Sequence, residues 1–359
     1  MKSKALLASF FCVTLLPGYR VSLPGYRYQF PADFYSHPAF RTEWWYYTGN
    51  LHSADGVRRF GFELTFFRQG VDRPQRPAAV WDVRDVWLAH LALSDLDGHR
   101  FFHTERLNRS GAGIAGAEEG QHRVWNGNWE VKWSGDSQQL QAVADQFRFQ
   151  LSLQPIKPPV VHGADGISQK SAGAGHASNY FSQSRLQTKG TIEVGTEKFQ
   201  VEGLSWMDHE FFTHQMEASQ SGWDWFSLQF DDGSDLMLYR LRRKDGSSDP
   251  YSSGTYIDPQ GRATHLKLPD ATLVPGKVWK SPATGGQYPI NWTIRVPSLG
   301  LDVALSTRLP QQELTGASKA SPAYWEGAIE VTGTKQGHAV KGAGYLEMTG
   351  YAGAVNFGG

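Results

Sequence analysis

The strongest constraint on the fold is a duplicated pattern of aromatic strands and glycine turns. The run TEWWYYTGNL begins at Thr42, and a similar aromatic run returns near residue 223. In the first copy residues 45–47 (WYY) lead to the turn Asp-Gly at 55–56, and in the second residues 225–227 (WFS) lead to Asp-Gly at 232–233. An apolar stretch follows each turn, and a strand, a glycine turn and a second strand in that order predict a β-hairpin.

A second repeat accompanies the first. Residues 190–208 and 327–347 both begin with a Gly-x-Ile-Glu-Val run and end with an aromatic residue, one intervening residue and an acid. Asp208 of the first copy thereby corresponds to Glu347 of the second. Two units that each open with an aromatic hairpin and close with such a strand predict tandem β-rich domains.

Length and composition agree with two domains. The chain has 359 residues, which suits two units of about 150 to 180 residues, each with its own core. Aromatic residues make up 13%, and 39 glycines and 18 prolines favour antiparallel sheet with tight turns over long helices. We therefore predict a mostly β fold, with an N-terminal domain at residues 30–214 and a C-terminal domain at 215–359.

The charge balance argues against a nucleic-acid partner. Lys and Arg number 35, Asp and Glu also number 35, and the net charge is zero. Binding to a phosphate backbone depends on an excess of basic side chains. We expect no nucleic acid among the partners of this protein.

The first 20 residues have the layout of a secretory signal. Lys2 and Lys4 precede an apolar stretch at residues 5–16, which is too short for an ordinary membrane span. We expect an exported protein, periplasmic or secreted, with no stable transmembrane span in the mature chain. No clean small-x-small site follows the apolar stretch, so the cleavage point stays open. Cys12, the only cysteine, lies in this segment, so the mature domains contain no disulfide.

The candidate chemistry concentrates at residues 204–212, LSWMDHEFF. Strand alternation places Trp206, Asp208 and Glu210 on one face, and His209 on the other. A carboxyl group among aromatic rings has its pKa raised by desolvation and can act as an acid near neutral pH. The alternative is a packed aromatic residue beside a carboxylate that bonds to backbone amides.

Neither a metal site nor a phosphate loop is predicted. His209 and His214 resemble the zinc-protease motif, but residues at i and i+5 do not share a helix face. The glycine-rich stretch at 162–176 lacks the Gly-Lys-Ser run of a phosphate loop. It predicts either a surface loop that covers the mouth of the first domain or a disordered segment.

Five segments together resemble the AttH and carotenoid 1,2-hydratase family, whose members are often labelled predicted secreted hydrolases. The resemblance covers roughly residues 33–352 and is specific because the motifs occur in the same order. The segments are His37-Pro38, TEWWYYTG at 42–49, ASNYFS at 177–182, WMDHE at 206–210 and GYLEMTGY at 344–351.

The resemblance implies two lipocalin-like (calycin-type) antiparallel β-barrels, a fold that can enclose one apolar ligand. In the hydratase branch a carboxylic acid protonates an isoprenoid double bond and water adds to the cation, without a metal or organic cofactor. Asp208 matches the acid of that branch, with His209 or Glu210 tuning it or positioning water. The substrate-binding candidates are Glu43, Trp44, Trp45, Tyr180 and Trp206.

Three functions follow as alternatives. The first is a cofactor-free enzyme that uses Asp208 as an acid on an isoprenoid or lipid. The second is a carrier that binds such a molecule unchanged. The third is a hydrolase whose water is activated by His209 or Glu210, since the chain has no Gly-x-Ser-x-Gly elbow for a serine nucleophile.

Overall fold

The computed structural model describes residues 18–71, 82–214, 216–316 and 323–353. The regular structure in these ranges is almost entirely antiparallel strand, which confirms the predicted fold class. None of the helices within these ranges is long and apolar enough to cross a bilayer. Most of the predicted signal segment, with Cys12, lies outside the described residues.

The first half of the chain forms one sheet with the path β4-β3-β2-β1-β13-β12-β9-β8-β7-β6-β5, which curls into a nearly closed barrel. The short strands β10 and β11 pair with β12 beside this path. The elements are η1 (Ala32–Phe34), β1 (Thr42–Ser53), β2 (Arg59–Gly70), β3 (Asp85–Asp95), β4 (Arg100–Arg109), β5 (Ala115–Glu118), η2 (Glu119–Gln121), β6 (Arg123–Asn126), β7 (Trp129–Ser134), β8 (Ser137–Val143), β9 (Phe147–Pro155), β10 (Val160–Val161), β11 (Ser168–Gln169), β12 (Ala177–Val194) and β13 (Glu197–Phe212).

The second half forms a half-barrel sheet with the path β17-β16-β15-β14-β25-β24-β22-β21-β18. In addition, β23 pairs with β24, and β19 and β20 form a small separate sheet. The elements are β14 (Gln220–Phe230), β15 (Asp235–Arg243), β16 (Ser253–Ile257), β17 (Ala263–Lys267), η3 (Leu268–Asp270), β18 (Thr272–Pro275), β19 (Val278–Lys280), β20 (Gln287–Pro289), β21 (Trp292–Val296), η4 (Pro297–Leu299), β22 (Leu301–Ser306), β23 (Glu313–Leu314), β24 (Tyr324–Lys335) and β25 (His338–Met348).

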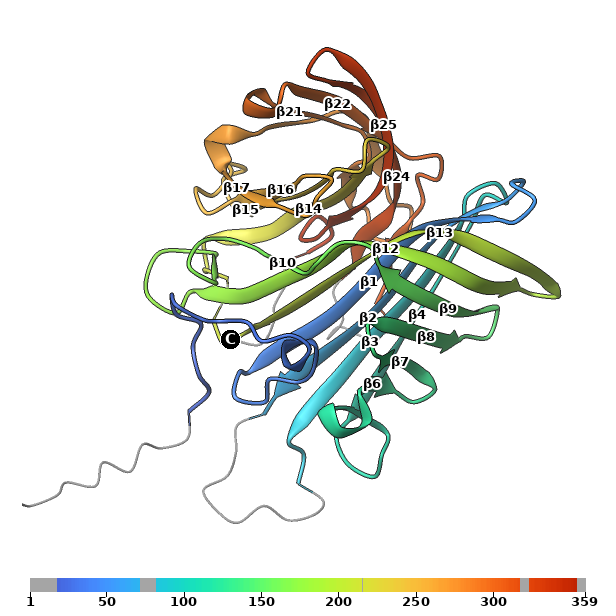
Figure 1. The fold of residues 1–359 in the computed structure, drawn as a ribbon, viewed down its shortest axis with the longest axis vertical. Helices are drawn as coiled ribbons and strands as arrows, with labels where there is room; N and C mark the ends of the chain where they lie inside the picture. Colours follow the sequence, from blue (N-terminus) through green and yellow to red (C-terminus); the bar gives the residue numbers. More distant parts are fainter. Residues whose placement is uncertain (1–17, 72–81, 215, 317–322, 354–359) are drawn as a thin grey trace, which may run out of the picture.

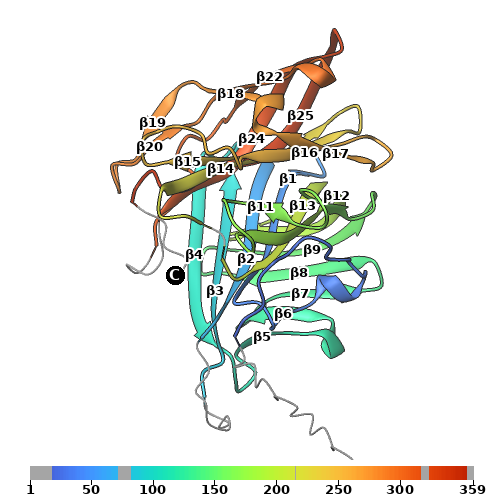
Figure 2. The ribbon, with the colours of Figure 1, turned by 90° about the vertical axis from the view of Figure 1, so that its left-hand side faces the viewer.

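The two sheets lie against each other. Figure 1 and Figure 2 both show the second sheet above the first, with β1, β12 and β13 on the side of the first sheet that faces it. The predicted boundary near residue 214 falls between β13 and β14. Whether the two units fold independently stays a prediction.

Strand burial follows from this arrangement. β9 alternates strictly between buried and exposed residues, as expected when one face lies in a core and the other in water. The second half of β13, residues 205–212, is buried on both faces. One face of β13 points into the first barrel and the other points toward the second sheet, so its polar side chains are enclosed on either side.

Three large apolar clusters and a small one around Ala92, Leu314 and Tyr324 stabilise the described part of the molecule. One fills the interior of the first barrel, with Trp45, Tyr47, Phe62 and Met207 among its fully buried members. Another lies within the second sheet around Trp292. The third joins the two sheets, and its members include Tyr46, Tyr180, Trp206, Trp225, Tyr239 and Tyr345.

Two buried ion pairs also join the sheets. Asp235 of β15 is fully buried and binds Arg185 of β12 and Lys157, each with an N to O distance of 2.7 Å. Arg185 also donates to the backbone carbonyls of Phe230 and Ser234. These contacts fix the second sheet on the first.

The strand pairing corrects one detail of the predicted repeat. Tyr46 of β1 pairs with Asp208 of β13, and Trp225 of β14 pairs with Glu347 of β25. Since Asp208 and Glu347 are counterparts, Trp225 corresponds to Tyr46, one residue away from the alignment with Trp45. Consecutive aromatic residues allowed two alignments, and only the face of the strand distinguishes them.

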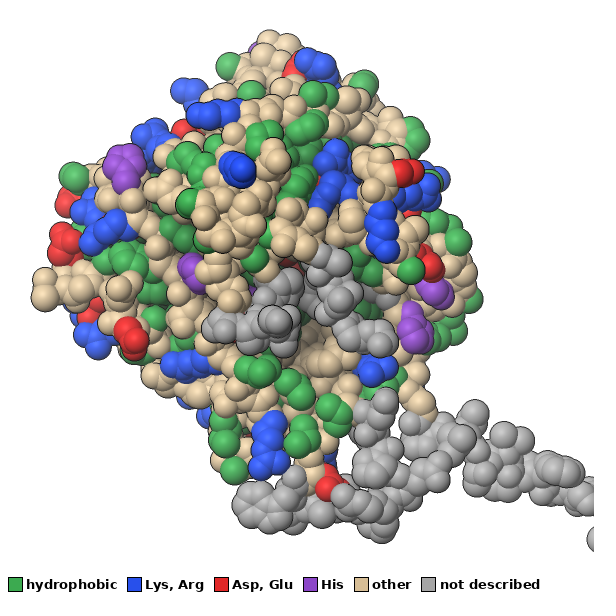
Figure 3. Space-filling model, turned by 180° about the vertical axis from the view of Figure 1, so that it is seen from behind, with side chains coloured by type: hydrophobic (Ala, Val, Ile, Leu, Met, Phe, Trp, Pro, Cys, Tyr) green, Lys and Arg blue, Asp and Glu red, His purple; other side chains and the backbone are tan. Residues whose placement is uncertain are grey.

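The exterior mixes charge and apolar surface. On the face drawn in Figure 3, described Lys and Arg side chains occur on both units among Asp, Glu and hydrophobic side chains.

Candidate active site

A cavity of about 100 Å³ lies between the two sheets. Its aromatic lining residues are Trp44, Tyr46, Phe67, Tyr180, Trp223, Trp225, Tyr239 and Tyr324. Its ionisable carboxyl and amino groups are Glu63, Lys170, Asp208, Glu210, Glu326 and Glu347. The resemblance implies barrels that can enclose an apolar ligand. The first barrel is filled by its own core, and this cavity is built from both units.

Asp208 is held in the cavity wall by three donors. Tyr180 Oη donates to Asp208 Oδ2 at 2.5 Å, Trp206 Nε1 donates to Oδ1 at 2.6 Å, and the Ser182 hydroxyl also donates to Oδ1. Burial raises the pKa of Asp208 to about 7, although these hydrogen bonds favour the ionised form. Near neutral pH a substantial fraction of molecules therefore carries a proton on this carboxyl group.

The donors of Asp208 are themselves fixed. Trp225 Nε1 of the second sheet donates to Tyr180 Oη at 3.0 Å. His162 Nε2 lies 2.6 Å from Ser182 Oγ, and its Nδ1 lies 2.8 Å from Thr255 Oγ1. Both sheets therefore set the orientation of the Asp208 carboxyl group.

Glu210 lies two residues along the same face and pairs with Lys170. The Lys170 Nζ is 3.2 Å from Glu210 Oε1, and the Ser178 hydroxyl donates to the same oxygen. Burial lowers the pKa of Lys170, but the Glu210 carboxylate outweighs it, and the net shift is upward. The cation also lies 4.0 Å from the ring centre of Tyr239. Lys170 thus remains charged in the cavity wall.

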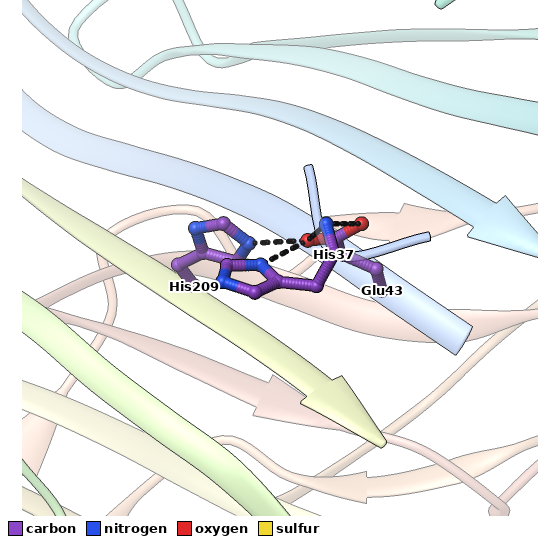
Figure 4. Close-up of side chains that lie close together, drawn as sticks. All are labelled: His37, Glu43 and His209. Atoms are coloured by element: carbon purple, nitrogen blue, oxygen red, sulfur yellow. Dashed lines mark hydrogen bonds and ion pairs between the residues drawn. The ribbon is translucent and has the colours of Figure 1, made fainter. Parts of the chain in front are cut away.

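His209 points the opposite way, into the first barrel. Figure 4 shows the side chains of His37, Glu43 and His209 directed toward one another. His209 Nε2 lies 3.0 Å from Glu43 Oε1, and His37 Nδ1 lies 2.8 Å from the same oxygen. Burial lowers the pKa of His209 to about 4, so the neutral ring donates to Glu43 through Nε2. Trp45 packs against this ring, with centroids 4.7 Å apart.

Glu43 is the centre of this network. Burial raises the pKa of Glu43, but Arg68, His209 and His37 outweigh it and hold the pKa well below its usual range. Arg68 Nε is 3.0 Å from Glu43 Oε2, and Arg68 is only 2% exposed. The network therefore joins β1, β2 and β13 at one end of the barrel. It also includes η1, because Asp33 of η1 contacts His37 at 2.9 Å.

The donor set of this network could in principle hold a metal. One ligand atom each from His37, Glu43 and His209 lies within 4.8 Å of the others, and two histidines with one glutamate form a common zinc set. However, these atoms already bond to one another at 2.8 and 3.0 Å, and the Arg68 guanidinium occupies the second oxygen of Glu43. The geometry is that of a hydrogen-bonded ion network.

The structure thus divides the predicted site residues into two groups. Asp208, Glu210, Trp44 and Tyr180 line the cavity, and Trp206 bonds to Asp208 behind its wall. His209, Glu43 and Trp45 lie in the first barrel, away from the cavity. The alternation predicted for residues 206–210 is confirmed, and it is the reason that His209 is separated from its two acidic neighbours.

Several cavity residues were not predicted. Lys170 belongs to the glycine-rich stretch, for which a surface loop over the mouth of the first domain or a disordered segment was predicted. The stretch is ordered and pairs with β12 through β11, with His162 and Lys170 buried. Glu63 and Glu326 are single acids within apolar strand runs, FGFELTFF and YWEGAI, and that isolation was an available signal. The second unit also supplies cavity residues, namely Trp225, Tyr239, Glu326 and Glu347.

The buried acids predict how stability depends on pH. Burial raises the pKa of Asp208 and Glu63 to about 7 and that of Glu347 to about 8, all above their values in an unfolded chain. The folded protein then binds more protons than the unfolded chain, so the free energy of unfolding should fall as pH rises toward 8. Each group contributes a slope of up to about 1.4 kcal/mol per pH unit.

Urea unfolding between about pH 6.5 and 8 measures this slope. Histidines whose pKa is lowered oppose the decline at the lower end of this window, because they still bind protons in the unfolded chain near pH 6.5, while His37, whose pKa is raised by its carboxylate partners, adds to the decline. The decline should therefore be clearest between about pH 7.2 and 8. Glu347→Gln should flatten the slope in the upper half of the window. A stability that is constant or rises across it would contradict the assignment of raised pKa values.

Comparison with known proteins identifies one family model and solved structures that share this fold. A family model described as AttH-like matches residues 21–351. A crystal structure from Nitrosomonas europaea, assigned to AttH, is 31% identical, with 92% of this chain and 98% of that chain covered and a TM-score of 0.82. Kievitone hydratase from Nectria haematococca is 16% identical, with 94% and 99% covered and a TM-score of 0.69, which shows a shared fold.

A curated relative is the dehydratase asqC from Emericella nidulans. It is 23% identical over 209 residues, and the match covers 56% of this chain. The chain spans 57% of the length of that dehydratase.

Proposed function

Because the chain belongs to the AttH-like family, which is related to hydratases and dehydratases, we propose that it adds water to, or removes water from, an apolar small molecule held between its two sheets. The observation that carries this proposal is Asp208, a carboxyl group poised to exchange a proton near neutral pH in an aromatic-walled cavity. No cofactor is invoked. The proposal includes export of the mature protein, as the first 20 residues predict.

In the hydration direction, protonated Asp208 gives its proton to one carbon of a carbon–carbon double bond. Positive charge develops on the neighbouring carbon, and the faces of the cavity aromatics stabilise it by about 1 to 2 kcal/mol for each desolvated contact. Water then adds to that neighbouring carbon, and the oxonium group formed loses one proton to give the alcohol. Dehydration follows the same steps in reverse, with the Asp208 carboxylate taking the proton from carbon.

The size of the cavity limits what enters it. At about 100 Å³ it is smaller than the roughly 300 to 1,000 Å³ of pockets that enclose drug-sized ligands. We propose that the reacting end of an isoprenoid or lipid chain occupies the space, with Trp44 and Trp223 at its boundary.

The direct test is incubation of the purified protein with an organic extract of its own organism in ¹⁸O-labelled water, followed by mass spectrometry. A hydroxylated product that carries one ¹⁸O supports hydration, and loss of water from an alcohol supports dehydration. Cleaved, labelled products would instead show a hydrolase. A lipid that copurifies and remains unchanged would show a carrier.

Tyr180→Phe provides a prediction about the acid itself. It removes a donor to Asp208 that favours the ionised form, so the pKa of Asp208 should rise. Hydrogen bonds to charged groups contribute about 1.5 to 3 kcal/mol, so the basic limb of the pH–rate profile should move upward by roughly one pH unit or more. The matched control is Tyr288→Phe, a buried tyrosine that donates to Glu313 at 2.8 Å away from the cavity lining. Equal profiles for the two variants would argue against Asp208 as the titrating group.

A further inference from the structure

Water that adds to a cation must lose a proton, and the cavity holds unused carboxyl groups near Asp208. Glu326 of β24 is 1% exposed and lines the cavity. Its Oε1 accepts from Tyr46 Oη of β1 at 2.5 Å. Its Oε2 is buried and has no hydrogen-bond partner among the described residues. One oxygen of Glu326 is thus positioned by the first sheet, while the other has no partner within hydrogen-bond geometry, although the Tyr324 hydroxyl also interacts with this carboxyl group.

Glu63 of β2 repeats this arrangement. It is fully buried, and its Oε1 accepts from Thr65 Oγ1 at 2.8 Å and from Tyr324 Oη at 3.2 Å. Its Oε2 also has no partner within the described part of the chain. Tyr324 Oη lies 2.6 Å from His90 Nδ1, and burial lowers the pKa of His90 to about 3. The neutral imidazole, the phenol and the Glu63 carboxyl form a connected path for a proton.

Such half-satisfied buried acids are costly in a structural role. Leaving a buried carboxyl oxygen without a partner destabilises a fold, and packing alone would favour an apolar residue at these positions. Glu347, the strand neighbour of Glu326, differs because Trp223 donates to it. The two free oxygens therefore single out Glu63 and Glu326 among the acids of the cavity.

The surroundings allow this pair to hold one proton. Burial raises the pKa of Glu63 to about 7, and burial together with the charges of Glu63 and Glu347 raises the pKa of Glu326 well above its usual range. One of the two is therefore neutral when the other is ionised. The titratable groups that line the cavity with the pair or interact with it are Tyr46 of β1, His90 of β3, Tyr180 of β12, Asp208 and Glu210 of β13, Tyr239 of β15, Tyr324 of β24, Tyr345 and Glu347 of β25, and Lys170.

We propose that Glu63 and Glu326 together form a second proton-transfer centre, which accepts the proton released by the adding water while Asp208 supplies the proton to carbon. This inference rests on the proposed hydration and dehydration. In hydration the C–H bond forms with the proton of Asp208, the C–O bond forms with water, and the second water proton passes to the singly charged pair. In dehydration the pair returns that proton to the departing hydroxyl group, and Asp208 takes the proton from carbon.

Net transfer in either direction moves one proton between the two centres. Exchange with solvent restores the starting state after each turnover, so no oxidant, reductant or further reactant is required. The first sheet alone supplies Asp208, but the second centre needs Glu326 from the second sheet. The reaction therefore depends on both units.

The experiment compares wild type, Glu326→Gln and Glu63→Gln in water that contains both D₂O and H₂¹⁸O, with the organism's organic extract as the probe. Wild type should place deuterium and ¹⁸O in the same product. Without the second centre, Asp208 still protonates the alkene reversibly, so Glu326→Gln should exchange deuterium into the alkene while ¹⁸O incorporation falls at least about 100-fold. The control is Glu313→Gln, a buried glutamate that accepts from Thr284 and Tyr288 outside the cavity lining.

A second readout needs no turnover. Infrared titration should show protonated carboxyl absorption near neutral pH that decreases in Glu326→Gln or Glu63→Gln and is unchanged in Glu313→Gln, while the absorption of Asp208 and Glu347 remains in all three variants. Glu326→Asp, which retains an acid, should recover part of the ¹⁸O incorporation if Glu326→Gln folds poorly.

The outcomes separate the two proposals. If wild type incorporates neither label, the proposed hydration fails, and the accepting role of the pair fails with it. If wild type is active but Glu326→Gln and Glu63→Gln keep its ¹⁸O incorporation, or lose deuterium and ¹⁸O equally, the second centre is wrong while the role of Asp208 stands.

Discussion

Replacing Asp208 by asparagine is expected to lower the rate of water addition by about 10² to 10⁴, the range attributed to a positioned general acid. Asparagine has nearly the same shape, and its carbonyl oxygen can still accept from Trp206 Nε1 and the Ser182 hydroxyl. It cannot release a proton to carbon. Both isotope labels should therefore disappear from the product together.

The same variant should remain folded and retain its ligand. The amide nitrogen of asparagine would face Tyr180 Oη, which already accepts from Trp225 Nε1. The Tyr180 hydroxyl then loses its acceptor, at a cost of about 1 to 3 kcal/mol. The melting temperature and the amount of copurified lipid measure these two properties. A variant with wild-type turnover, or one that loses turnover only because it unfolds, would leave Asp208 as a structural residue.

Replacing Arg68 by methionine is expected to reduce the free energy of unfolding by about 3 to 5 kcal/mol, the cost of leaving a buried charge without its partner. Arg68 and Glu43 are 2% and 0% exposed, so removing the Arg68 charge leaves the Glu43 carboxylate buried. Arg68 also donates to the carbonyl oxygens of His37 and Phe40, so the substitution releases the segment before β1 as well. Urea unfolding at neutral pH measures the effect.

The difference in the free energy of unfolding between wild type and Arg68→Met should depend on pH because of Glu43. Its pKa is depressed in the wild-type fold, so its stabilising contribution is present above its unfolded pKa and is lost as pH falls. Without Arg68 the carboxyl group can be protonated more easily, and the gap between wild type and variant should narrow in acid. Arg148→Met, which breaks an exposed pair with Glu193, should cost only about 0 to 1 kcal/mol. Similar losses for the two variants would contradict the importance of the network.

Much of the fold could be predicted from local pattern. The hairpin repeat, the glycine turns and strict alternation required antiparallel sheets, and alternation at residues 206–210 correctly separated Asp208 and Glu210 from His209. These features depend only on neighbours along one strand. The one-residue error in aligning Trp45 with Trp225 arose because adjacent aromatic residues satisfy either face equally well.

The cavity could not be predicted in the same way. It forms where two sheets meet, and strand pairing within each sheet says nothing of how the sheets pack on one another. Lys170 reaches Glu210 from a glycine-rich segment 40 residues earlier in the sequence, and Glu326 meets Tyr46 across a separation of 280 residues. Single acids in apolar strands, such as Glu63, were the available sign that both faces of a strand are enclosed.

The counterpart positions Asp208 and Glu347 both face this one cavity, each from the closing strand of its own unit. Two identical copies of one unit, related by a twofold axis, would bring the same strand of each to a shared interface. The cavity here likewise receives one acid from each of the two units of a single chain. The two acids are not identical: the first unit presents a short acid bonded by tyrosine and tryptophan, and the second presents a longer one beside Glu326. An apolar molecule in the cavity therefore meets two unlike walls, which is the condition for giving its two ends different chemistry.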